Sequence, residues 1–262
     1  NGVVIARNYS AYTLEISPSL IETNINSLLD DLSEVIDIQA KDRRNFIKLF
    51  NESKTFDSFP IRTLLSDTEV ARFTAQRFRF PGVEIRARLF RQYPYGELGS
   101  HLIGYIGRVS QKDREKLIAE LDSSKSSDDD WAQRKNINLL GMPYIGKIGV
   151  EQSYEYALRG SPGFEQVEIT AGGRAVRTLS TSSSSPGKNL VLSVDIKLQS
   201  LVEELYGKRR GAFVAIEPET GDVLAFVSKP NFNPNDFVEG IDAGTWKALN
   251  ESLEKPLYNR PL

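Results

Sequence analysis

The chain has 262 residues, with 33 Lys and Arg against 35 Asp and Glu, which gives a formal net charge of −2. This balance excludes a protein that binds nucleic acid or an anionic membrane through its overall charge, so any basic site must be local. With no cysteine and one histidine, the chain lacks the residues for disulfides, a cysteine nucleophile or a histidine-ligated metal cluster, and we expect no cofactor and no metal.

The composition favours a folded, water-exposed protein. A chain of this length is expected to form one large domain or two to three smaller ones. No apolar run approaches the roughly 20 residues of a membrane helix. Because the sequence opens at Asn1 without a signal-peptide pattern, we expect it to be a piece of a longer protein.

Two β-rich stretches open the chain, and three helical patterns follow. Gly2–Ala6 and Tyr12–Ile16 are expected to be short strands, the second with alternating apolar and polar residues. The helical patterns cover 28–36, 46–50 and the residues after Ser66, where Glu69 completes the spacing of a capping box.

An arginine-rich segment comes next, with six arginines and four phenylalanines between Arg72 and Arg91. Such a mixture is typical of a nucleic-acid groove. However, residues 83–89 alternate apolar and charged side chains as a half-buried strand does. Arg86 and Arg88 then lie on the solvent side, so a charged sheet face explains them, with an acidic protein partner as the alternative.

The middle of the chain is predicted to contain one helix, one ribbon and two loops. Ser110 can cap the helix. The other predicted features are a solvated loop at 122–130, a strand at 167–170, a hairpin turn at 171–173, and a Ser/Thr/Pro/Gly-rich linker at 178–187. We place a domain boundary near Lys188.

Beyond Lys188 the pattern changes to strand, helix and hairpin. A strand is predicted at 189–194, followed by a helix that Asp195 caps and that buries Leu198, Leu201, Val202 and Leu205. Residues 212–216 and 223–227 are continuous apolar runs, which predict a β-hairpin buried on both faces. Such a hairpin needs further layers that the remaining residues do not supply.

Two Ser-x-x-Lys tetrapeptides, Ser185–Lys188 and Ser252–Lys255, have the spacing that can place a Lys amine beside a Ser nucleophile. Pro186 and Gly187 interrupt the first, and the second leads directly into Pro256, so neither is expected to form a rigid helical turn. His101 is expected to pack rather than to act as a general base, because no Gly-x-Ser-x-Gly turn accompanies it. No catalytic residue is therefore assigned.

The run Arg91–Gly96, followed by Ser100–Tyr105, resembles the linker region of class B penicillin-binding proteins. Further segments in the same order resemble their non-penicillin-binding module, namely Ile148–Glu151, Tyr154–Glu155, Leu158–Gly160, Gly163, Glu168, Gly173–Arg174 and Val176–Arg177. Others resemble the opening of the transpeptidase domain, namely Leu190–Gln199, Ala215–Ile216, Thr220–Gly221, Val223–Ala225, Ser228–Pro230, Asn233–Asn235 and Asn259–Arg260. Phe237–Val238 and Gly240–Ile241 are most similar to the elongation-type penicillin-binding protein 2.

Together with the predicted elements, the resemblance implies an α+β fold. Residues 1–188 would form an elongated, strand-rich, non-catalytic pedestal with a small helical head at about 17–81. Residues 189–262 would form the first helix and β-hairpin of a transpeptidase domain of the serine β-lactamase type. The sequence ends at Leu262, before the family's Ser-x-x-Lys, Ser-x-Asn and Lys-Thr-Gly motifs, so we expect no catalysis from this chain.

For a full-length protein, the resemblance implies a serine D,D-transpeptidase that cross-links peptidoglycan stem peptides and is acylated by β-lactams. It also implies an upstream anchor in the bacterial inner membrane, a periplasmic location, and two partners, a rod-shape scaffold protein and a SEDS-type glycan polymerase. Three alternatives stay open: a division-type relative, an unrelated envelope adaptor, and a Ser-Lys enzyme that uses Ser185 and Lys188.

Overall fold

The computed structural model describes residues 2–17, 20–21, 24–52, 58–123, 144–161, 163–170, 175–238 and 240–262. The chain forms two compact units. The first unit comprises Asn1–Arg7, Arg91–Phe164 and Thr181–Leu262, and the second comprises Asn8–Phe90 and Glu165–Ser180. Both units combine helices with small sheets, so the predicted α+β class is confirmed.

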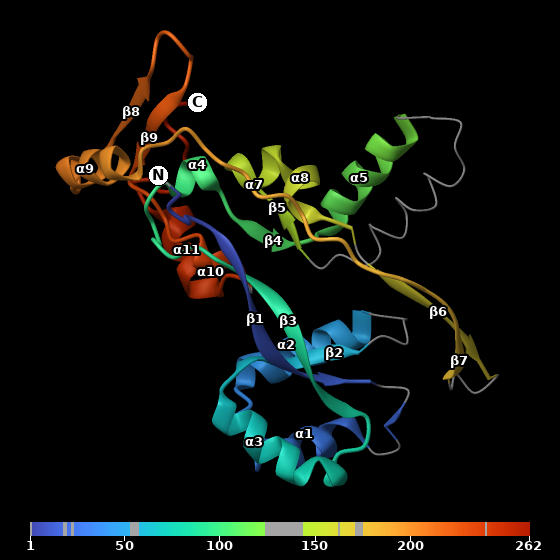
Figure 1. Ribbon diagram of the computed structural model, residues 1–262. Helices are drawn as coiled ribbons and strands as arrows, with labels where there is room; N and C mark the ends of the chain where they lie inside the picture. Colours follow the sequence, from blue (N-terminus) through green and yellow to red (C-terminus); the bar gives the residue numbers. More distant parts are fainter. Residues whose placement is uncertain are drawn as a thin grey trace. The chain divides into compact units, whose positions relative to one another are not determined.

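The second unit is built on a three-stranded sheet with the order β2-β1-β3 (Figure 1). Its strands are β1 (Arg7–Ile16), β2 (Phe59–Leu65) and β3 (Val83–Gln92), and its helices are α1 (Ile25–Ser33), α2 (Ala40–Glu52), α3 (Asp67–Gln76) and the short η2 (Arg77–Arg79). The β1 and β2 strands are antiparallel, with Ile16 opposite Phe59. All three α-helices contribute to one hydrophobic core that also contains Leu14, Ile16 and Ile61.

Local signals predicted the three helices of this unit correctly. The Ser66 hydroxyl accepts from the Glu69 amide, and the Glu69 carboxylate accepts from the Ser66 amide at 2.8 Å, so the capping box is present. The Asn24 side chain caps α1 by accepting a hydrogen bond from the Asn26 amide at 2.9 Å. Such caps satisfy amide groups that have no partner within the helix.

Two strand predictions in the first 92 residues need correction. Gly2–Ala6 is not a strand, because β1 begins at Arg7. In β3, Val83 and Phe90 are buried, but Leu89 is 70% exposed and Ala87 is also exposed. The predicted half-buried face therefore fails in the middle of the strand, because the core beneath this sheet covers only the end near Val83.

A two-stranded ribbon of β6 (Phe164–Ile169) and β7 (Ala175–Ser182) contributes to the same unit. The strand predicted at 167–170 is confirmed, and the predicted turn at 171–173 lies outside the described residues. The linker predicted at 178–187 is wrong over its first half, since residues 178–182 belong to β7. Serine and threonine supply the same backbone hydrogen bonds as other residues, so their abundance does not prevent strand pairing.

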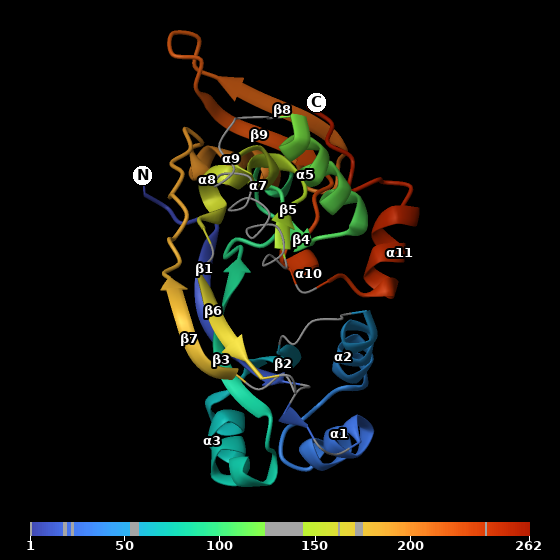
Figure 2. The same ribbon diagram turned by 90° about the vertical axis from the view of Figure 1, so that its right-hand side faces the viewer.

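The first unit contains two small antiparallel sheets and seven helices within the described residues (Figures 1 and 2). The sheets are β4 (Ile106–Arg108) with β5 (Tyr144–Gly146), and β8 (Gly211–Ile216) with β9 (Val223–Lys229). The helices are α4 (Ser100–Ile103), α5 (Gln111–Ser123), α7 (Gly149–Ser153), α8 (Glu155–Arg159), α9 (Ile196–Tyr206), α10 (Asn235–Val238) and α11 (Ala243–Glu251). The α9 helix packs on β9, which positions the residues described below.

Capping predictions hold in this unit as well. Ser110 exchanges hydrogen bonds with Asp113 at the start of α5, and the Asp195 carboxylate accepts from the Lys197 amide at 2.8 Å at the start of α9. Of the solvated loop predicted at 122–130, Asp122 and Ser123 instead end α5, and the rest lies outside the described residues.

Two predictions beyond Lys188 need correction. Residues 189–194 form no strand. The β8–β9 hairpin is present, but only β9 is buried, since Val227 is fully buried whereas Ile216 of β8 is 57% exposed. The reason is that α9 packs on β9 and covers it, whereas the outer side chains of β8 face solvent. The boundary near Lys188 stays a prediction. None of the described helices is long and apolar enough to cross a membrane.

Candidate functional site

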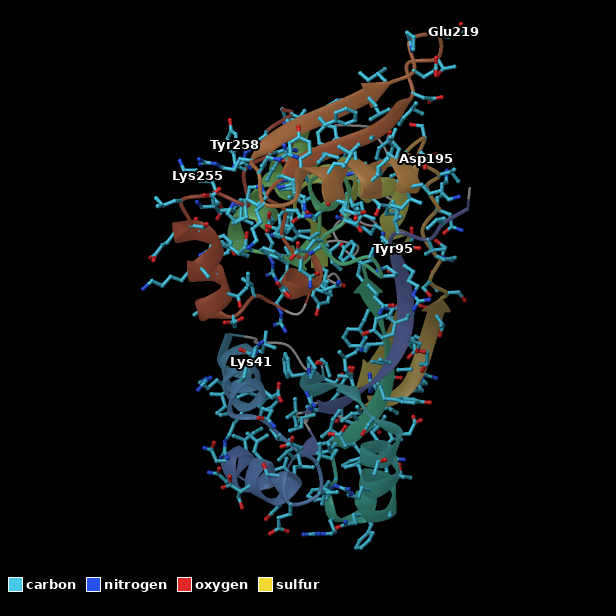
Figure 3. All side chains as sticks on the ribbon, turned by 90° about the vertical axis from the view of Figure 1, so that its left-hand side faces the viewer. Lys41, Tyr95, Asp195, Glu219, Lys255 and Tyr258 are labelled. Carbon is cyan, nitrogen blue, oxygen red and sulfur yellow. The ribbon has the colours of Figure 1, made fainter. Side chains whose placement is uncertain are left out.

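Neither Ser-x-x-Lys tetrapeptide forms the helical turn that a Ser-Lys mechanism needs. The backbone of Ser185 pairs with Ser161 in an isolated bridge, and Lys188 lies in irregular structure. Ser252 follows the end of α11, and Lys255 has a left-handed backbone with φ 44°. Lys255 lies on the loop after α11, near the C-terminal end of the chain (Figure 3).

His101 packs in the interior of the first unit, as expected. It is 3% exposed, its ring lies edge-on to Phe232 at 5.0 Å, and its Nε2 is 3.3 Å from the carbonyl oxygen of Pro230. Burial lowers the pKa of His101, although the carbonyls of Pro230 and Pro256 oppose that effect. A buried imidazole that contacts the Phe232 ring and the Pro230 carbonyl is a packing residue.

The first unit also holds a set of buried and half-buried polar side chains, which we name the polar joint. It consists of Arg91, Tyr93, Glu151, Gln199, Glu203, Asn231 and Asn235. These residues come from the end of β3 and the residue after it, from α7, from α9, from the segment after β9, and from the start of α10. The polar joint therefore connects parts of the sequence that are more than one hundred residues apart.

Glu151 is the centre of one half of the polar joint. Its carboxylate, 3% exposed, accepts from Arg91 Nε at 2.8 Å and from the Tyr93 hydroxyl at 3.1 Å. The Tyr93 oxygen in turn accepts from the Ile106 amide at 3.1 Å. Burial and the Glu151 charge raise the pKa of Tyr93, so it stays protonated and keeps donating.

Asn235 extends this half to α10. Its Oδ1 accepts from the Tyr93 amide and its Nδ2 donates to the Tyr93 carbonyl, each at 3.0 Å. One side chain thus satisfies both backbone groups of Tyr93, as a neighbouring strand would do. Since Asn235 begins α10, the helix is fixed to the segment before α4.

Glu203 is the centre of the other half. Its Oε1 accepts from the Gly99 amide and from Gln199 Nε2, both at 2.8 Å, and its Oε2 accepts from Asn231 Nδ2 at 2.8 Å. Lys229 Nζ lies 3.7 Å from the same Oε2. Glu203 is 7% exposed, so these donors replace the water that an ionised carboxylate would otherwise bind.

An aromatic cluster lies beside the polar joint. The Tyr105 and Phe237 rings stack at 4.0 Å, and Phe232 meets Phe237 edge-on at 5.6 Å and His101 at 5.0 Å. Such pairs add to the free energy gained by burial of the rings. The cluster therefore strengthens the contact between residues 101–105 and residues 232–237.

The arginines of β3 in the second unit are paired. Arg88 donates to both carboxylate oxygens of Glu15, at 2.6 and 2.9 Å, and Ser58 donates to Glu15 at 2.6 Å. Arg86 lies 3.9 Å from Glu15 and 3.4 Å from Glu84. Burial of Glu15 would raise its pKa, but the hydrogen bonds from Arg88 and Ser58 outweigh it and lower the pKa. The predicted arginine face exists, with part of its charge neutralised.

The side chains of the polar joint bind one another and the backbone. Its carboxylates accept hydrogen bonds from arginine, tyrosine, amide and backbone donors of the protein itself. Within the described ranges, no group of three or more His, Asp or Glu side chains could hold a metal ion. The arrangement can hold distant segments in register, which is what a scaffold requires.

Part of the polar joint was predictable from the sequence, but its central residue Glu203 was not predicted. Arg91, Tyr93, Glu151, Gln199 and Asn235 lie within segments that carried the family resemblance, whereas Glu203 and Asn231 were not singled out. The predicted apolar stripe of α9 is confirmed at Val202, which is buried. It is wrong at Leu201 and Leu205, which are 53% and 63% exposed, while Gln199 and Glu203 are buried. The i, i+4 spacing of Gln199 and Glu203 beside Val202 is the signal that could have revealed this face.

The comparison with known families agrees with this geometry. The chain belongs to the family described as the penicillin-binding protein dimerisation domain, which matches residues 1–192. Among individual relatives, it is 37% identical over 260 residues to the peptidoglycan D,D-transpeptidase MrdA of Acinetobacter baumannii and to that of Escherichia coli K12. The alignments cover 99% of this chain but only 36% and 39% of those two proteins. The predicted resemblance to class B penicillin-binding protein 2 is confirmed.

The fold is also shared with a solved structure, a complex between penicillin-binding protein 2 and MreC from Helicobacter pylori. The TM-score is 0.73 at 23% sequence identity, and the match covers 98% of this chain and 45% of that one. At this identity the likeness establishes the fold alone. The chain therefore spans less than half the length of the relatives to which it is similar.

Proposed function

We propose that this chain is the non-catalytic pedestal, followed by the opening of the transpeptidase domain, of an elongation-type penicillin-binding protein. In the full-length protein, the catalytic domain would cross-link peptidoglycan stem peptides and be acylated by β-lactams. The chain itself would position that domain and bind partners. Residues 1–188, with the head at about 17–81, would be the pedestal, and 189–262 would begin the catalytic domain.

The observation that carries this proposal is the polar joint. The family match ends at residue 192, and the joint connects residues on both sides of that point, with Tyr93 bound to Asn235 and Gly99 bound to Glu203. A module whose task is to hold another needs buried, oriented contacts across the boundary. Charge-assisted hydrogen bonds provide this because their geometry is strict.

The proposed partners follow from the relatives. The related Helicobacter pylori protein was crystallised with MreC, so we propose that this chain binds the rod-shape scaffold protein of its own organism. Homology to MrdA supports a location on the periplasmic side of the inner membrane and partnership with a SEDS-type glycan polymerase. Peptidoglycan and β-lactams would bind only to the full-length protein.

A binding experiment tests this proposal. The purified chain is immobilised, and the extracytoplasmic part of the rod-shape scaffold protein from the same organism is titrated over it; we expect saturable binding. Arg86→Glu tests whether the arginine face takes part. If it does, reversal of this exposed charge should weaken binding to an acidic surface of the partner and reduce the salt dependence of that binding. Arg177→Glu in β7 is the matched control, since Arg177 is also an exposed arginine paired with a glutamate, Glu168.

Two results would contradict the proposal. No binding of either the scaffold protein or the polymerase would remove the partner role. Stoichiometric covalent labelling of this chain by a fluorescent penicillin, located at Ser185 or Ser252 by peptide mass spectrometry, would instead support the Ser-Lys enzyme. We expect no labelling, because acylation requires a serine activated by an adjacent base.

A further inference from the structure

We propose that Glu203 is a positioning residue. It fixes Lys229–Asn231, which comprises the last residue of β9 and the two residues after it, against the 97–99 loop. This inference rests on the proposed function, because the segment it fixes would lead toward the transpeptidase site. The two oxygens of the Glu203 carboxylate bind different segments of the chain. Oε1 accepts from the backbone amide of Gly99, and Oε2 accepts from the side-chain Nδ2 of Asn231, each at 2.8 Å.

The donors on Glu203 come from three separate segments. Gly99 precedes α4, Gln199 lies on α9 itself, and Asn231 follows β9. Each of them can only donate to a carboxylate, which has acceptor capacity for all of them. If a side chain with an N–H group replaced the carboxylate, at least one of these donors would therefore face another donor.

The 97–99 loop and the residues after β9 are also bound to each other directly. Asn231 Nδ2 donates to the Glu97 carbonyl at 3.1 Å, and the Phe232 amide donates to the Ser100 hydroxyl at 3.4 Å. Glu203 closes this set of contacts from the α9 side. The Phe232 amide is consequently a reporter of whether the two segments stay together.

The contacts continue from β9 to the last described residues. Ser228, which precedes Lys229, donates to the Tyr258 carbonyl at 3.2 Å and accepts from the Arg260 amide at 3.2 Å. Arg260 in turn donates to the carbonyls of Glu254 and Tyr258. Displacement of the end of β9 would therefore move residues 258–260, the part of the chain that the family places shortly before its nucleophile.

Amide hydrogen exchange of the 262-residue chain tests the role of Glu203. Glu203→Ala removes both acceptors. Exchange should accelerate about tenfold or more at Gly99, because its buried amide loses its acceptor. It should also accelerate at Phe232, because the segment after β9 can then move away from Ser100. Glu203→Gln keeps one acceptor oxygen for Gly99 and places an NH₂ against Asn231. It should therefore accelerate exchange at Phe232 while Gly99 stays protected.

Glu204→Gln is the matched control, because Glu204 is the next residue of α9 and is exposed. It should change neither amide. A purely structural role of Glu203 would accelerate exchange throughout α9 and the β8–β9 hairpin to the same extent. That uniform result, or unchanged exchange at Phe232 in Glu203→Ala, would overturn the proposal.

A second measurement connects Glu203 to the reaction. In the full-length protein proposed above, Glu203→Gln should slow acylation by a fluorescent penicillin about ten- to a hundredfold, the range that small displacements of a site produce. Glu204→Gln should acylate at the wild-type rate. If the full-length wild-type protein is not acylated at all, the proposed function fails while the exchange result still stands; an unchanged rate in Glu203→Gln overturns the positioning role alone.

Discussion

At the scale of single residues, His101 offers the clearest titration. It is the one histidine of the chain, and burial lowers its pKa below the ordinary value of 6.5. Its surroundings include the Phe232 ring, the carbonyls of Pro230 and Pro256, and the charges of Arg260 and Glu203. In the unfolded chain the imidazole takes up its proton near pH 6.5, before the folded chain does.

This difference sets the sign of the pH dependence. The unfolded state binds more protons than the folded state between the folded pKa and 6.5, so the free energy of unfolding should fall as the pH decreases through 6.5. Each unit by which the pKa is lowered corresponds to about 1.4 kcal/mol. His101→Gln, which can still donate to Pro230, should remove this slope between pH 7.5 and 5.5 in urea titrations. An imidazole NMR titration midpoint at or above 6.5 in the wild type would refute the argument.

At the scale of elements, the approach of α4 to α7 depends on Gly104. Its φ of +81° and ψ of −159° belong to a region that only glycine occupies readily, and a Cβ there would lie 1.8 Å from the Ile148 carbonyl oxygen. Gly104→Ala should therefore destabilise the first unit by at least about 3 kcal/mol. The comparison is with Gly221→Ala, where φ is +77° but a Cβ meets nothing within 4 Å.

Gly221→Ala should cost about 1 to 2 kcal/mol, the cost of the left-handed backbone alone. Both variants are measured by urea unfolding with tryptophan fluorescence. Gly221 lies in the turn between β8 and β9, and Glu219 marks the tip of the same turn in Figure 3. Equal losses for the two glycines would show that contact with Ile148 does not limit the packing of α4.

The success of the sequence analysis differs between elements for a physical reason. Ser66, Ser110 and Asp195 predicted their helices because a cap requires only residues within one turn. Burial depends on partners far along the chain, so the exposure of Leu89 and Leu205 was not predictable from periodicity. Glu203 was missed for the same reason, since its partner Gly99 is 104 residues away.

At the scale of the whole molecule, the first unit includes both Arg91–Phe164 and Thr181–Leu262. The sequence pattern predicted that residues after about 188 form an incomplete half-domain, and the exposed apolar side chains of β8 agree with an open sheet face. Yet the polar joint and the aromatic cluster bind residues 91–107 to residues 199–237. If the chain is cut between these two segments, the open sheet face predicts that the fragments separate, whereas the contacts predict that they stay together.

Limited proteolysis distinguishes the two expectations. The connecting segment 183–195 has no regular structure apart from the bridge at Ser185, and Val191 within it is 96% exposed, so the first cut should fall there. We expect the two fragments to stay associated after the cut and to co-elute in size-exclusion chromatography, because buried hydrogen-bonded charges and stacked rings connect them. The Glu203→Ala variant should release the C-terminal fragment more readily, whereas Glu204→Gln should not. Immediate separation of the wild-type fragments would mean that the contacts of the polar joint are too weak to hold the two fragments together. Residues 189–262 would then be the poorly stabilised half-domain that the sequence pattern predicts.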